Sequence, residues 1–132
     1  MTRVLLVDDE PLVLIGMQGM LNWAALGYEV VGTARNGAEA LRAVQEKQPD
    51  IVVSDIRMPV MDGLEATRHI RGMTREDARR IPIFALSANA FADDIQRSLQ
   101  CGMNTHFNKP VDMDSICAAL HYWLEHDKGN RP

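Results

Sequence analysis

Four short apolar runs and a fifth, more polar segment alternate with longer amphipathic stretches along this chain. The apolar runs fall at 3–7, 29–34, 51–54 and 82–86, and the polar segment falls at 105–108. They are mostly continuous rather than alternating in hydrophobicity, which is typical of parallel strands that are covered by helices on both faces. Between and after the runs, apolar residues recur at helical spacing, which predicts five helices. A chain with this alternation is expected to fold as an α/β domain.

The expected architecture is a three-layer, doubly wound five-stranded parallel sheet with five helices. Right-handed crossovers leave few strand orders for such a chain, and the flavodoxin-like order 2-1-3-4-5 is the one we expect. The 132 residues suffice for one domain. We expect that domain to span 1–125, and 126–132 to form a polar tail or the start of a linker.

Charge and hydropathy argue against several classes of function. The net charge of −4 argues against direct binding of nucleic acid, because phosphate contacts need a basic face. No apolar run approaches the roughly 20 residues that span a bilayer. The first residues lack the pattern of a signal peptide. Cys101 and Cys117 have no metal-ligand spacing, which favours a reducing compartment. We therefore expect a cytoplasmic protein without membrane or nucleic-acid contacts.

Chemically active side chains follow four of the predicted strands. Asp8 and Asp9 follow the first, Asp55 the third, Ser87 the fourth and Lys109 the fifth. Parallel strands bring these positions to one edge of the sheet, where open α/β folds bind their ligands. Clustered carboxylates repel one another unless a cation lies among them. The set therefore predicts a hard metal ion, and Mg²⁺ is the one we expect.

Each of these residues alone has an ordinary interpretation. Asp9 could simply cap the helix that begins near Pro11. Ser87 could be a serine at the end of a strand, and Lys109 a surface lysine before a turn. The prediction rests on their joint occurrence, in the order acid, acid, hydroxyl and amine.

Four motifs carry a resemblance to a known family. They are V-D-D-E-P at 7–11, S-D-I-R-M-P-V-M-D-G at 54–63, A-L-S-A-N-A at 85–90 and N-K-P-V-D at 108–112. In this order and spacing, the chain resembles the response-regulator receiver domain of two-component signalling, as in chemotaxis regulators. The tract 87–112 most resembles the receivers of hybrid histidine kinases.

The resemblance implies a phosphoacceptor and a metal site. Asp55 matches the phosphoryl acceptor. Asp9 matches the direct Mg²⁺ ligand, and Asp8 matches the acid that holds a metal-bound water. The backbone carbonyl of Arg57 matches the remaining protein ligand. Positive charge at this site would offset the charge on the phosphoryl oxygens, which is how phosphoryl transfer is catalysed.

The resemblance also implies a switch. Ser87 matches the switch hydroxyl, and Lys109 matches the lysine that pairs with the phosphate. The switch aromatic of the family, usually Tyr or Phe, falls here on His106. Phe107 should face the opposite side of its strand and belong to the core.

The implied function is that of a phospho-switchable module in a two-component system or phosphorelay. Asp55 would take a phosphoryl group from a phosphohistidine on a histidine kinase or histidine phosphotransfer protein. The change would reach an output domain or a downstream protein. Such a module is not an enzyme in the usual sense, since it catalyses only its own phosphorylation and dephosphorylation.

The alternative is a Mg²⁺-dependent phosphohydrolase that uses an aspartyl-phosphate. That class usually needs a general acid two residues beyond the nucleophile, where this chain has Arg57, and a capping insertion for which the chain has no room. A flavin or nucleotide carrier would need a Gly/Ser/Thr-rich loop after the first strand, where Asp8, Asp9 and Glu10 would repel a phosphate. A DNA-binding regulator would need a second, basic domain.

Overall fold

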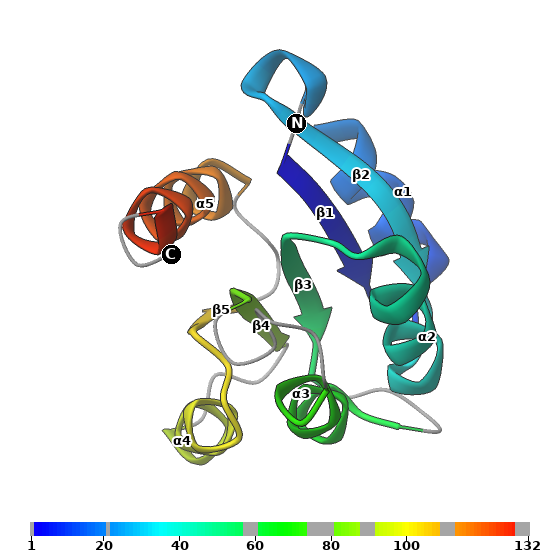
Figure 1. Cartoon of the computed structure of the whole chain (residues 1–132), viewed down its shortest axis with the longest axis vertical. Helices are drawn as coiled ribbons and strands as arrows, with labels where there is room; N and C mark the ends of the chain where they lie inside the picture. The colour runs from blue at the N-terminus through cyan, green and yellow to red at the C-terminus, as the bar shows by residue number, and fades with distance from the viewer. Residues whose placement is uncertain are drawn as a thin grey trace.

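A single parallel sheet organises the molecule. The computed structural model describes residues 2–20, 22–56, 61–73, 81–87, 92–108 and 113–128. The strands lie side by side in the order β2-β1-β3-β4-β5, and every neighbouring pair is parallel (Figure 1). This confirms the expected order 2-1-3-4-5. The strands are β1 (Thr2–Val7), β2 (Tyr28–Ala34), β3 (Ile51–Asp55), β4 (Ile83–Ser87) and β5 (Thr105–Asn108).

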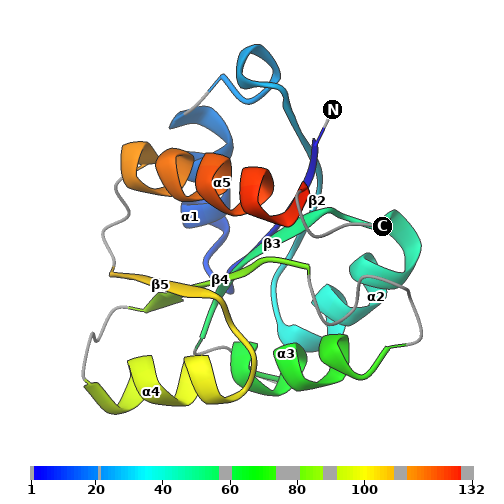
Figure 2. The same cartoon turned by 60° about the vertical axis from the view of Figure 1, so that its left-hand side comes forward.

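Five α-helices cover the sheet, as expected, and a short 3-10 helix lies in the first crossover. Figure 2 shows α1 and α5 on one side of the sheet and α3 and α4 on the other. The last helix extends to Lys128. The helices are α1 (Pro11–Met20), η1 (Ala24–Leu26), α2 (Gly37–Lys47), α3 (Gly63–Arg71), α4 (Ala92–Gln100) and α5 (Met113–Lys128).

Each face of the sheet has its own buried cluster, so the central strands carry apolar side chains on both faces. Alternate residues of one strand point to opposite faces. On β1, for example, Leu5 and Val7 pack with α2 and α3, whereas Val4 and Leu6 pack with α1 and α5. The helical side chains against the first face include Val44, Leu64 and Ile70; those against the second include Leu14, Met17, Ile116 and Leu120.

Side-chain caps set where α2 and α3 begin. Asn36 Oδ1 accepts a hydrogen bond from the N–H of Glu39 at 2.9 Å, and Asp62 Oδ1 accepts one from the N–H of Glu65 at 2.8 Å. Each bond satisfies a backbone donor that the first helical turn leaves without a partner. The two caps therefore set the first residue of α2, which follows β2, and of α3, which follows β3.

The first helix follows its apolar spacing in part. That spacing places Val13, Met17, Met20 and Leu21 on one face, of which Leu21 and the side chain of Met20 lie outside the described residues. The structure buries Leu14 together with Met17, and Val13 is only half-buried. Apolar residues surround most of this helix, so the periodicity did not select one face. Two of them stay largely exposed, Leu12 at 82% and Ile15 at 63%.

The first crossover is built into the core by two aromatic residues. Trp23 and Tyr28 are both buried, and Trp23 Nε1 donates to the carbonyl oxygen of Met17 at 3.1 Å. The Tyr28 hydroxyl lies 3.0 Å from Nδ1 of His121 on α5. Within the described ranges, no helix combines the length and the hydropathy needed to cross a membrane.

Candidate functional site

The strand register brings three of the predicted site residues to the same edge of the sheet. Val7 pairs with Ser54, so the next positions along the two strands are Asp8 and Asp55. Asp55 pairs in turn with Leu86, and Ser87 follows. Neighbouring strands are about 4.8 Å apart. The ends of β1, β3 and β4 therefore meet at the carboxyl edge, as the sequence predicted.

Asp8 lies just before α1 and is held by two hydrogen bonds. Its side chain is fully buried, with 0% exposure. Its backbone N–H extends the β1–β2 ladder by donating to the carbonyl oxygen of Ala34 at 3.0 Å. Its carboxylate Oδ1 accepts a hydrogen bond from the N–H of Glu10 at 2.9 Å. The Asp8 carboxylate thus satisfies a backbone donor just ahead of α1.

Three consecutive carboxylates form a candidate cation site. Oxygen atoms of Asp8, Asp9 and Glu10 lie within 4.8 Å of one another. Their exposure increases along the chain, from buried Asp8 through half-buried Asp9 to exposed Glu10. Oxygen-only donors at this spacing fit a hard divalent cation such as Mg²⁺, which is commonly held by one or two carboxylates and several waters. The sequence prediction omitted Glu10 from this cluster, although its position next to Asp9 was the available signal.

Asp55 ends β3 and is almost completely buried, at 5% exposure. Its backbone carbonyl accepts a hydrogen bond from the hydroxyl of Ser54 at 2.9 Å. The N–H of Ile56 donates to the carbonyl of Leu86 at 2.9 Å, which keeps the chain against β4 beyond the strand end. Two buried carboxylates on adjacent strands, Asp55 and Asp8, favour a positive charge between them because burial penalises an anion without one.

Ser87 and His106 share one face of the sheet on adjacent strands. Ser87 pairs with Asn108, and Ala85 pairs with His106, so Ser87 and His106 are diagonal neighbours. Ser87 is buried at 2% exposure, and His106 is half-buried. Phe107 faces the other side, where its ring centroid lies 5.7 Å from that of Phe84. The predicted orientation of Phe107 is therefore confirmed.

Two predicted site residues, Arg57 and Lys109, lie outside the described residues. Lys109 directly follows Asn108, which ends β5 and pairs with Ser87. Arg57 directly follows Ile56, whose N–H is bonded to β4. The roles of Arg57 and Lys109 therefore stay predictions.

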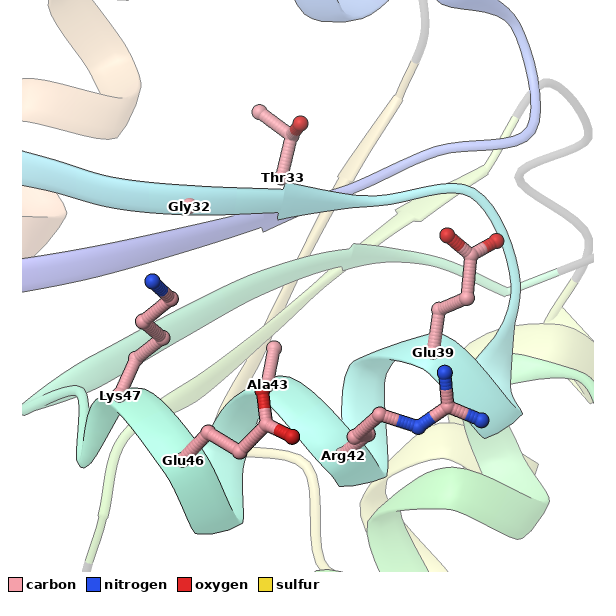
Figure 3. Close-up of a pocket in the computed structure, with 7 residues that line it drawn as sticks. All are labelled: Gly32, Thr33, Glu39, Arg42, Ala43, Glu46 and Lys47. Atoms are coloured by element: carbon pink, nitrogen blue, oxygen red, sulfur yellow. The ribbon is translucent and has the colours of Figure 1, made fainter.

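A separate shallow pocket lies between β2 and α2 and has a volume of about 190 Å³. None of the predicted site residues lines it. Figure 3 shows its charged side chains, two acidic and two basic, projecting from one helix. This arrangement is typical of a solvated helix face. The lining residues are Gly32, Thr33, Glu39, Arg42, Ala43, Glu46 and Lys47.

The family model and a solved structure that match this chain both describe receiver domains. Residues 4–121 match the family model of the response regulator receiver domain. The receiver domain of sensor histidine kinase PA1611 from Pseudomonas aeruginosa PAO1 is 37% identical in sequence, with a TM-score of 0.80. The match covers 94% of this chain and 98% of that one. That structure contains a magnesium ion coordinated in the active site cleft.

Longer proteins match the chain over part of their length. The sensor histidine kinase RcsC of Escherichia coli (strain K12) is 36% identical over 97% of this chain and 13% of its own length. The transcriptional regulatory protein KdpE of Mycobacterium tuberculosis is 37% identical over 91% of this chain and 50% of its own. The chain thus spans half or less of these curated relatives. The parallel sheet, the acidic carboxyl edge and the family match agree: this chain belongs to the response regulator receiver domain family of two-component systems.

Proposed function

We propose that Asp55 of this receiver domain accepts a phosphoryl group from a phosphohistidine. The observation that carries the proposal is the position of Asp55, buried at the end of β3 and level in register with buried Asp8. In the transfer, a carboxylate oxygen of Asp55 forms a bond to phosphorus while the bond from phosphorus to the histidine nitrogen breaks. The histidine leaves as imidazole.

The acidic cluster supports a Mg²⁺ site beside the acceptor. Asp9, the half-buried member, would be the direct ligand, together with Asp55 and the backbone carbonyl of Arg57. Asp8 is oriented by the N–H of Glu10 and would hold a metal-bound water. When bound, Mg²⁺ supplies charge neutralisation at the phosphoryl oxygens. The magnesium in the cleft of the PA1611 receiver supports this assignment.

The remaining residues would bind the phosphoryl group and report its presence. The ammonium group of Lys109 would pair with a phosphoryl oxygen, and the hydroxyl of Ser87 would donate a hydrogen bond to another. Ser87 would then move toward Asp55. His106, its diagonal neighbour on β5, would respond and thereby alter the surface formed by α4, β5 and α5.

The partners follow from the chemistry and from the longer relatives. The phosphoryl donor would be a histidine kinase or a histidine phosphotransfer protein, and the recipient of the signal an output domain or a downstream protein. RcsC and KdpE, a sensor kinase and a transcriptional regulator, support both kinds of context. We place the module in the cytoplasm, without direct contact with nucleic acid or membrane, and we expect it to catalyse only its own phosphorylation and dephosphorylation.

Labelling with a small phosphodonor tests the proposal. With Mg²⁺ and phosphoramidate, intact mass measurement should show one added phosphoryl group. Asp55→Asn should abolish this species. Asp50→Asn should not, because Asp50 precedes β3 at the opposite edge, where its Oδ2 accepts from the N–H of Arg3 at 2.8 Å.

The same preparation distinguishes the phosphohydrolase alternative. A signalling module should show no turnover of p-nitrophenyl phosphate, whereas a hydrolase would release p-nitrophenol continuously. Labelling that persists unchanged in Asp55→Asn would place the acceptor at another residue and contradict the proposal.

A further inference from the structure

Two loops meet backbone to backbone beside Asp55. Gly37, the first residue of α2, donates its N–H to the carbonyl oxygen of Met61 with an N–O distance of 2.6 Å. Gly63, the first residue of α3, donates its N–H to the carbonyl oxygen of Ile56 at 2.8 Å. Helices α2 and α3 are neighbours on the same face of the sheet (Figures 1 and 2). The start of α2 thus contacts the residues just before α3, and the start of α3 in turn contacts the chain just after Asp55.

The contact continues from Gly63 to Asp55 itself. A Cβ atom added at Gly63 would lie only 2.4 Å from the backbone carbonyl oxygen of Asp55. Gly37, Met61, Gly63 and Asp55 therefore form a line of close backbone contacts, which we call the Gly37–Asp55 stack. Every member of the stack belongs to the described residues.

Glycine is required at position 37 because a side chain there would collide with Met61, and not because of the backbone conformation. Its φ is not among the positive values found at Gly27 and Gly102. A Cβ atom at this position would lie 2.4 Å from the carbonyl oxygen of Met61 and 2.8 Å from its carbonyl carbon. Backbone atoms cannot rotate away from such a contact as a flexible side chain can. One of the two segments would have to shift.

The segment at Met61 is the one expected to move. Helix α2 is fixed against the sheet by its buried residues Ala40 and Val44. Met61 is only half-buried. Because Gly63 follows it by two residues and packs on Asp55, a displacement at Met61 is transmitted to the acceptor strand end.

We propose that Gly37 is a positioning residue for the phosphoacceptor. Its missing side chain sets how closely the segment at Met61 approaches, and so fixes the backbone around Asp55 that the metal and the phosphoryl group require. This inference rests on the proposed role of Asp55. A misplacement of about 1 Å at a reacting group can slow a reaction roughly 100-fold, so a small shift is measurable.

The test compares three variants for Mg²⁺ affinity by calorimetry and for phosphorylation rate with phosphoramidate. Gly37→Ala should weaken Mg²⁺ binding about 10-fold, as the loss of supporting contacts around a metal site commonly does. Helix propensity favours Ala over Gly, so poor helix formation would not explain a loss. Gly72→Ala is the matched control, because the nearest atoms to its added Cβ are 3.6 Å away. It should bind Mg²⁺ as the wild type does.

Asn36→Ala separates positioning from general destabilisation. It removes the cap of α2 without adding an atom at the stack, so the melting temperature should fall while Mg²⁺ affinity stays unchanged. Gly37→Ala with wild-type affinity and rate would overturn the proposal. An equal loss of affinity in Asn36→Ala at matched stability would also overturn it.

A measurement on the wild type keeps the proposal testable if Gly37→Ala does not fold. Addition of Mg²⁺ should shift the amide NMR resonance of Gly37, whose N–H reports the contact with Met61, and leave that of Gly72 in place. A fixed Gly37 resonance would overturn the inference. A wild-type chain that binds no Mg²⁺ and takes no phosphoryl group would overturn the proposed function as well. Failure of the function is therefore seen in the wild type, whereas failure of the role of Gly37 alone leaves wild-type binding and phosphorylation intact.

Discussion

Arg71, the last residue of α3, donates two hydrogen bonds to the carbonyl oxygen of Gly102, from Nε at 3.0 Å and from Nη2 at 2.6 Å. The same guanidinium donates to the carbonyl of Ile81 at 2.7 Å and to Oδ1 of Asn104 at 2.9 Å. That Oδ1 also accepts the N–H of Ile83 at 2.8 Å. One side chain thus joins α3, the start of β4 and the turn before β5, at the edge of the sheet opposite the acceptor.

Replacing Arg71 should cost stability rather than chemistry. Arg71→Met removes charge-assisted hydrogen bonds and leaves partly buried carbonyls without a donor, so the free energy of unfolding should fall by about 3 kcal/mol. Urea denaturation measures it. Arg68→Met, on an exposed position of the same helix, should stay within about 0.5 kcal/mol of the wild type. Equal losses in both variants would contradict the role assigned to Arg71.

The acidic cluster predicts unequal effects of its members on the metal. Asp9→Ala should weaken Mg²⁺ binding more than Asp8→Ala, since a direct ligand is lost rather than a water-mediated one. Without metal, Asp9→Ala should raise the melting temperature by relieving repulsion between carboxylates. Asp8→Ala should gain less, because the N–H of Glu10 loses its acceptor. A titration with full-strength binding in Asp9→Ala would refute the assignment.

The switch predicts a response at His106. Addition of beryllofluoride and Mg²⁺, which mimic the phosphorylated acceptor, should shift the imidazole NMR signals of His106. Exposed His69 on α3 serves as an internal reference. Lys109→Ala should still allow some phosphorylation, yet leave His106 and α5 unchanged by it. If His106 stays fixed while Ser87 and α5 respond, another residue reports the switch.

Cys101 predicts a loss of stability at alkaline pH. Burial raises the pKa of its thiol above the ordinary value of 9.0, in opposition to the charge of Arg68. Below pH 9.0 the thiol keeps its proton in the folded and the unfolded chain. Above it, the unfolded chain ionises first and binds fewer protons, so the contribution of Cys101 to stability falls. The difference in unfolding free energy between wild type and Cys101→Ala should therefore stay constant up to about pH 9 and narrow above it. A difference that stays constant above about pH 9 would contradict this.

Local sequence patterns determined the strands and the residues at their ends. Strands β1, β3 and β4 each contain a short apolar run, which is followed by Asp8, Asp55 and Ser87 respectively. A strand and the polar residue that follows it can be recognised from a few neighbouring residues in the sequence. The parallel arrangement then follows from the helices between the runs, so the meeting of these side chains could be predicted without coordinates.

Packing between distant segments decided the rest. The apolar residues of α1 allowed several buried faces, and contact with the sheet selected the one with Leu14. The backbone contact of Gly37 with Met61 and the side-chain hydrogen bonds of Arg71 to Gly102 join segments far apart in the sequence. No local pattern encodes such contacts, because they depend on how closely two separately formed elements approach one another in the folded chain.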